Sequence, residues 1–116
     1  MDMKTLAEPR FIESEIRALE EEIEWQRKYM LGGQNDDKVL AHIDRLQAEI
    51  VQLRMRSESI QQTIRDNISD PEVLRMIELY QHGRTWMQIN TAVYGYPDYQ
   101  ACRQRVVRAI TKIDFE

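Results

Sequence analysis

Residues 39–64 carry the most regular pattern of hydrophobic and polar positions in the chain. Eight positions recur in alternating steps of four and three, and seven of them are apolar: Val39, Ile43, Leu46, Ile50, Leu53, Ile60 and Ile64, with Ser57 as the exception. This spacing is typical of a helix that buries one narrow stripe against another helix. The pattern therefore predicts a long helix with a coiled-coil seam.

A matching stripe precedes it. Its apolar members are Ile12, Ile16, Leu19, Ile23 and Met30, and Gln26 occupies the remaining seam position. We expect this helix to begin at Glu8-Pro9, because proline suits the first helical turn. The segment 31–36 contains glycines that can end a helix and Asn and Asp residues that can cap the next one. Such a short connection predicts an antiparallel hairpin.

Three shorter helical segments follow between residues 70 and 113. Gly83 ends the first, and the turn Tyr94-Gly95-Tyr96-Pro97 separates the second from the third, which is expected over about 97–113. This is the layout of a helix-turn-helix, whose second helix lies in the major groove of DNA. The sequence therefore predicts an all-α protein. A long antiparallel helical hairpin (coiled coil) over residues 1–68 is followed by a three-helix helix-turn-helix unit over residues 69–116.

Helix-start signals support these boundaries. Ser69 with Glu72, and Thr85 with Gln88, each place a hydroxyl three residues before an acid or an amide. In such a capping box the two side chains satisfy backbone N–H groups at the start of a helix. We therefore expect two helices to begin directly after these hydroxyls, and Pro97 to begin the last helix.

The last helix has two different faces at a rotation of about 100° per residue. Its expected core face consists of Tyr99, Cys102, Val106, Ala109, Ile110 and Ile113. The opposite face and its flanks carry Gln100, Arg103, Gln104, Arg105, Arg108 and Lys112. Glutamine can bond adenine and arginine can bond guanine in the major groove, while basic residues at the edges can bind phosphates. Arg84 and Thr85, where the middle helix begins, complete the predicted DNA-binding set. A merely solvated helix face has a similar composition.

A second apolar stripe on the hairpin predicts a dimer. Phe11, Ala18 and Trp25 follow heptad spacing on the first helix, and Tyr29 lies one turn beyond Trp25. On the second helix, the corresponding apolar residues are Val51 and Met55. Large aromatic side chains on an otherwise charged face indicate a contact surface. Two hairpins could bury it as a four-helix bundle, so we expect a homodimer. Packing against the C-terminal unit of the same chain remains an alternative.

Charge and composition narrow the possible functions. The net charge is −4, and it is uneven, since residues 1–34 carry eight acids and five bases whereas residues 70–116 carry six of each. The acidic excess therefore lies away from the predicted DNA-binding face. The single cysteine, Cys102, excludes a disulfide framework and favours a reducing compartment. No stretch approaches the roughly 20 apolar residues of a membrane span. We expect a soluble protein in the bacterial cytoplasm, with no membrane partner.

Catalysis is not indicated. His42 and His82 lie far apart in the sequence and Cys102 stands alone, so no metal-ligand spacing is present. No glycine-rich phosphate loop follows a strand. We expect no enzyme activity, no catalytic or metal-ligating residues and no cofactor.

The C-terminal segment also resembles a known family. The resemblance rests on Asp70-Pro71-Glu72-Val73, Leu79-Tyr80, Gly83, Thr85-Trp86, Ile89 and the arginines of the last helix. These residues resemble small phage-encoded late-gene transcriptional regulators of the RinA/ArpU kind, whose C-terminal unit is similar to region 4 of sigma factors. The chain departs from the family at Asn90, where many members have alanine, and by one extra residue in Tyr94–Tyr96. The resemblance implies a regulator from a phage or mobile genetic element that binds double-stranded DNA.

Two functional hypotheses result. The first is a DNA-binding transcriptional regulator, dimeric through its hairpin. The alternative is a protein-interaction module or inhibitor. It would bind RNA polymerase or a host nucleic-acid enzyme through the sigma-like unit, or through the acidic run of Glu20 to Glu22 and Glu24 in the hairpin.

Overall fold

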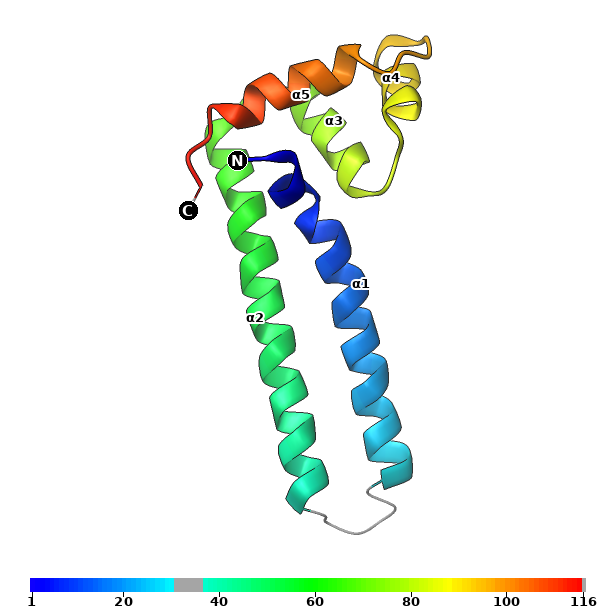
Figure 1. Ribbon diagram of the computed structural model, residues 1–116, viewed down its shortest axis with the longest axis vertical. Helices are drawn as coiled ribbons and strands as arrows, with labels where there is room; N and C mark the ends of the chain where they lie inside the picture. The colour runs from blue at the N-terminus through cyan, green and yellow to red at the C-terminus, as the bar shows by residue number, and fades with distance from the viewer. Residues whose placement is uncertain (31–36, 116) are drawn as a thin grey trace. The chain divides into compact units, whose positions relative to one another are not determined.

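The computed structural model describes residues 1–30 and 37–115, and in this part of the chain it is helical without strands (Figure 1). Its elements are α1 (Met3–Trp25), a π-helical turn η1 (Gln26–Met30), α2 (Asp37–Asn67), α3 (Pro71–Gln81), α4 (Trp86–Tyr94) and α5 (Ala101–Thr111). The predicted all-α class is confirmed, with a long helical hairpin followed by a three-helix unit. The caps expected within residues 31–36 lie outside the described residues.

The chain divides into two compact units. One, which we call the hairpin unit, comprises Phe11–Ser57. The other, the helix-turn-helix unit, comprises Met1–Arg10 together with Glu58–Glu116. The first turns of α1 and the end of α2 therefore belong to the same unit as α3, α4 and α5.

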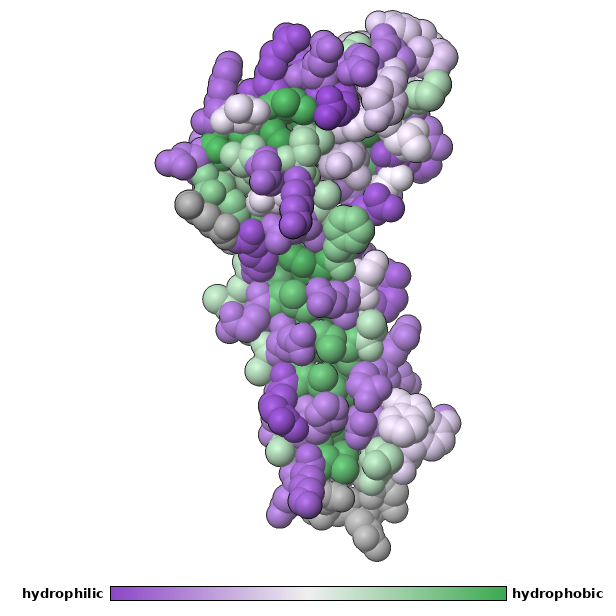
Figure 2. All heavy atoms as spheres, viewed as in Figure 1, coloured by the Kyte–Doolittle hydropathy of each residue, from purple (hydrophilic) through white to green (hydrophobic). Residues whose placement is uncertain are grey.

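The hairpin unit is held together by the predicted seam. Its core cluster contains Ile23, Val39, Ile43, Leu46 and Ile50, with Ile16 and Leu19 packed against it. Figure 2 shows hydrophobic side chains in a line along the hairpin, bordered by hydrophilic ones. Met30 is an exception: it is exposed, so its predicted place in the seam is wrong. The turn over residues 26–30 is π-helical and has more residues per turn than an α-helix, so the heptad spacing does not extend to Met30.

The beginning of α1 also differs from its prediction. The helix starts at Met3, and Pro9 lies inside it and is buried, so the expected start at Glu8-Pro9 is wrong. The Asp2 carboxylate accepts the backbone N–H of Thr5 at 2.8 Å and satisfies one of the first donors. Leu6 is fully buried in a hydrophobic core. Packing of this turn therefore outweighs the local signal of the proline.

The helix-turn-helix unit has one continuous core. Its buried members are Leu6, Ile60, Ile64, Ile68, Val73, Met76, Ile77, Trp86, Ile89, Cys102, Val106, Ile110 and Ile113. A buried polar link lies beside them, because the Gln81 amide donates to the Leu6 carbonyl at 3.0 Å and accepts from the Gln61 amide at 2.9 Å. The link joins the first turns of α1 to α2 and α3.

The caps of α3 and α4 fix the helix boundaries. Asp70, and not Ser69, caps α3 by accepting the N–H of Glu72 at 2.9 Å, so the predicted capping box there is wrong. A carboxylate one residue further along is the better placed acceptor. The capping box of α4 is confirmed, since the Thr85 hydroxyl accepts from Gln88 and the Gln88 amide oxygen accepts from Thr85.

The last helix begins later than predicted. It runs from Ala101 and not from Pro97, because the Asp98 side chain accepts the N–H of Gln100 at 2.8 Å and holds residues 97–100 in a turn. Tyr99 consequently lies outside the helix and is exposed, so its predicted place on the core face is wrong.

A candidate nucleic-acid interface on α5

The core face of α5 determines which of its residues reach solvent. Cys102, Val106 and Ile110 are buried in this helix. Burial raises the pKa of the Cys102 thiol, which fits a small apolar filler better than a nucleophile. Trp86 of α4 lies in the same core and stacks on Tyr80, with ring centroids 4.7 Å apart. The helix is thus fixed in rotation about its own axis, with one face turned outward.

The connection between α4 and α5 is fixed by two residues. Gly95 ends α4 in the left-handed conformation, with φ of 85°, which residues with a Cβ adopt only at a cost. Asn90 of α4 is fully buried, and its amide donates to the carbonyl of Tyr96 at 2.8 Å. The Oδ1 atom of Asn90 has no hydrogen-bond partner among the described residues. Asn90 therefore links α4 directly to the turn that precedes α5.

Four predicted DNA-contact residues are exposed on one side of the helix-turn-helix unit. Gln100, Gln104, Arg108 and Lys112 recur at intervals of four, and all four side chains are exposed. Arg103 lies beside them and is half-buried. Residues four apart are neighbours on a helix surface. The part of the chain that the structure describes contains no side-chain hydrogen bond or ion pair to Gln104, Arg108 or Lys112. These groups are available to a ligand.

Arg105 has a different environment. Its guanidinium donates to the Glu72 carboxylate, to the Tyr94 hydroxyl at 2.6 Å and to the Asp70 carboxylate at 2.8 Å. The hydrogen bonds to Glu72 and Tyr94 raise the pKa of Arg105. The N–H of Glu72 and, to a smaller extent, Arg105 lower the pKa of Asp70. The guanidinium thus joins α5 to the start of α3 and the end of α4, and two carboxylates balance its charge.

A hollow of about 380 Å³ lies beside this cluster. Its walls come from the α2–α3 connection and from α5, and its polar lining includes Ser69, Asp70, Arg105, Arg108 and Lys112. Because Arg105 already faces Asp70, the cations left to face an incoming anion are Arg108 and Lys112. These two side chains give this edge of α5 a positive character suited to phosphate.

The start of α4 presents a more mixed surface. Arg84 and Thr85 are both exposed, and the Thr85 hydroxyl is engaged as the cap of α4. Arg84 borders a second hollow, of about 450 Å³, together with Leu79, Met87, Gln88, Thr91, Ala92 and Pro97. The lining is mostly apolar apart from Arg84, Gln88 and Thr91. Arg84 is exposed and offers a charged contact here, and Met87, which is also exposed, offers an apolar one.

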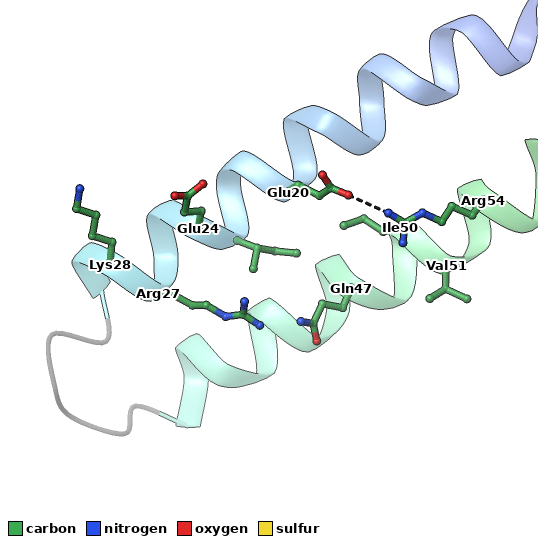
Figure 3. A pocket seen from close by; sticks show the side chains of 9 residues that line it. Glu20, Glu24, Arg27, Lys28, Gln47, Ile50, Val51 and Arg54 are labelled. Carbon is green, nitrogen blue, oxygen red and sulfur yellow. Dashed lines mark hydrogen bonds and ion pairs between the residues drawn. The ribbon is translucent and has the colours of Figure 1, made fainter.

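The predicted dimerisation residues all reach the surface of the hairpin unit. Phe11, Ala18, Trp25, Tyr29, Val51 and Met55 are all exposed, and Trp25 contacts Tyr29 with ring centroids 5.6 Å apart. Only Val51 among them lines the groove of about 700 Å³ that runs between α1 and α2 (Figure 3). The charged residues along that groove, Arg27 and Arg54 among them, were not singled out by sequence reasoning. They occupy heptad positions next to the seam, so the sequence pattern could have identified them.

Comparison with known proteins adds no family. None of the family models, curated proteins or solved structures compared with this chain matches it. The resemblance to phage late-gene regulators therefore stays a prediction.

Among residues 1–30 and 37–115, no group of three side chains is arranged to hold a metal ion. Within the same residues, every helix is too short or too polar to traverse a lipid bilayer.

Proposed function

We propose that this chain is a DNA-binding transcriptional regulator that presents α5 to the major groove. The observation that carries the proposal is the face of Gln104, Arg108 and Lys112, which is exposed and unpaired among the described residues while the opposite face of α5 is buried. The capped α4 and the Gly95 turn hold that helix in place. Rigid support of a polar helix face is what base readout requires.

The side chains of this face have distinct chemical roles in the proposal. Gln104 and Arg108 lie one turn apart and reach into the same groove, where an amide can bond adenine and a guanidinium can bond guanine. Arg103 and Lys112 lie nearer the edges, where phosphates run. Arg84 and Gln100 extend the phosphate contacts. Arg105 is excluded from this set because its guanidinium is occupied by Asp70, Glu72 and Tyr94.

The origin and assembly of the regulator follow from other considerations. An origin in a phage or mobile element rests on the sequence resemblance alone. Helix-turn-helix proteins commonly read two half-sites as dimers, and a groove on the hairpin unit, lined by the exposed Val51, supports a homodimer here.

Selection of bound duplexes from a random pool, followed by fluorescence-anisotropy titrations, tests the proposal. Gln104→Ala is expected to relax the preference at one base position, changing discrimination by about 1–3 kcal/mol. Lys112→Ala should weaken selected and scrambled sites alike and reduce the salt slope by roughly one unit. Arg45→Ala, which removes an exposed charge from α2 in the hairpin unit, is the matched control and should leave binding unchanged.

The decisive negative result is a folded variant in which Arg103, Gln104, Arg108 and Lys112 are all alanine and DNA binding is unchanged. That outcome would transfer the proposal to the protein-interaction module. The hollow on α4 favours this second candidate, because it is largely apolar and Met87 beside it is exposed. RNA polymerase or a host nucleic-acid enzyme would then be sought as the partner.

A further inference from the structure

A groove runs along the hairpin unit between α1 and α2 (Figure 3). Its apolar lining consists of the buried Ile23 and Ile50 and the exposed Val51, and its polar lining of Glu20, Glu24, Arg27, Lys28, Gln47 and Arg54. We propose that this groove binds the hairpin of a second copy of this chain, in a two-fold symmetric pairing. The proposal specifies the dimer surface of the proposed function, but its test involves no DNA, so either one can fail without the other.

The small core of the hairpin unit is the first argument. Among the described residues its buried cluster consists of five side chains, Ile23, Val39, Ile43, Leu46 and Ile50. A two-helix unit of this size buries a small fraction of its apolar surface, so packing against further helices would stabilise it. A groove between antiparallel helices is also where a further helix packs in a four-helix bundle. A second hairpin supplies two such helices.

The charge pattern of the polar lining is the second argument, and it selects a second copy over other occupants. Glu20 and Arg54 already pair across the groove at 2.9 Å. Glu24 and Arg27, three residues apart in this lining, have no ion-pair partner among the described residues. In a two-fold pairing the same patch meets itself, so Glu24 of each copy can face Arg27 of the other. A partner of one charge sign, such as nucleic acid, would meet both signs in the groove, which is lined by two carboxylates and three cations.

The groove is a different surface from the second apolar stripe, which contains Trp25 and Tyr29, and Val51 belongs to the groove. With the seam at Ile16, Leu19 and Ile23, residues 20, 24 and 27 lie on one flank of α1, whereas Trp25 and Tyr29 lie on the other. Val51 is 52% exposed and lines the groove, and Met55 on the same helix is 57% exposed and does not line it. These two residues provide a matched pair for the experiment.

Sedimentation equilibrium of the full chain between about 1 and 100 µM tests the pairing. We expect a dimer of twice the 13.9 kDa chain mass. Val51→Glu should raise the dissociation constant about tenfold or more, because it places a carboxylate in the apolar lining that the second copy would cover. Met55→Glu and Trp25→Glu should leave it within about twofold. Far-UV circular dichroism verifies that each variant keeps its helices, as expected for positions that are already exposed in one copy.

The charge argument has its own variants. Glu24→Arg should weaken the dimer, and adding Arg27→Glu to it should restore most of the lost affinity. The proposal is overturned if the wild type is monomeric throughout, if Met55→Glu disrupts the dimer as strongly as Val51→Glu, or if only Trp25→Glu disrupts it. It is likewise overturned if the variant with both Glu24→Arg and Arg27→Glu dimerises no more tightly than the variant with Glu24→Arg alone.

Discussion

At the scale of single residues, two arginines of α5 illustrate how position decides role. Arg105 is held by Asp70, Glu72 and Tyr94, whereas Arg108 has no partner among the described residues. Both looked alike in the sequence, as basic residues at or beside the polar face of one helix. The two carboxylates that hold Arg105 belong to residues more than 30 positions earlier in the chain. No local sequence pattern could have revealed these partners. For this reason the sequence placed Arg105 among the phosphate contacts.

The first residue-scale prediction separates these roles. Arg105→Ala should lower the free energy of unfolding by about 1–2 kcal/mol, because it removes partly exposed ion pairs and one hydrogen bond to a tyrosine. Arg108→Ala should leave stability within about 0.5 kcal/mol and reduce affinity for DNA. Urea denaturation of both variants measures the difference. Equal stability of the two variants would contradict the role given to Arg105.

Acid titration checks the same cluster. The pKa of Asp70 is lowered in the folded chain, so its contribution to stability is present above the ordinary carboxyl range, near pH 4, and is lost as the pH falls through the lowered value. The stability difference between wild type and Arg105→Ala should therefore persist at pH 7 and shrink below about pH 4. A difference that stays constant down to pH 2 would mean that Asp70 does not contribute.

At the scale of elements, local signals predicted the structure only where no tertiary contact or better-placed side chain overrode them. The seam of α2 and the capping box of Thr85 and Gln88 depend on residues within one or two turns, and both are confirmed. The starts of α1 and α5 depend on the burial of Leu6 and on the turn held by Asp98, so both were misplaced. The exposure of Met30 depends on a π-helical turn that has no simple sequence signature.

The element-scale prediction concerns the turn between α4 and α5. Gly95 has φ of 85°, and a Cβ built there has no atom within 4 Å, so the strain of a substitution comes from the backbone alone. Gly95→Ala should cost about 1–2 kcal/mol, and Gly95→Asn less, because asparagine tolerates the left-handed region better. Thermal or urea unfolding measures both. A neutral Gly95→Ala variant would mean that α4 does not end in this conformation.

Gly83 serves as a comparison for Gly95. It also has positive φ, of 90°, but a Cβ there would lie 3.2 Å from the Arg10 guanidinium carbon. Alanine at this position therefore meets backbone strain and a close side chain together. We expect Gly83→Ala to destabilise at least as much as Gly95→Ala in the same unfolding measurement, because the backbone strain remains even if the Arg10 side chain moves aside.

At the scale of the whole molecule, the helix-turn-helix unit is not contained in residues 69–116. Its core includes Leu6 from α1, Ile60 and Ile64 from α2, and Ile68, which directly follows α2. The buried Gln81 amide adds hydrogen bonds to the Leu6 carbonyl and to Gln61. The sequence boundary at residues 68 and 69 followed the capping signals, which mark where helices start. They carry no information on which distant side chains complete a core.

The last prediction follows from this composite core. Leu6→Ala in the full chain should lower the free energy of unfolding by about 2–5 kcal/mol, as for other large buried side chains. A fragment of residues 69–116 loses Leu6, Ile60, Ile64 and Ile68 together, so it should lack a cooperative thermal transition by circular dichroism. Adding Ile60, Ile64 and Ile68 back in a fragment of residues 58–116 should restore part of that cooperativity. A fully cooperative 69–116 fragment would show instead that α3, α4 and α5 suffice, and that Leu6 and the end of α2 merely cover a domain that is already complete.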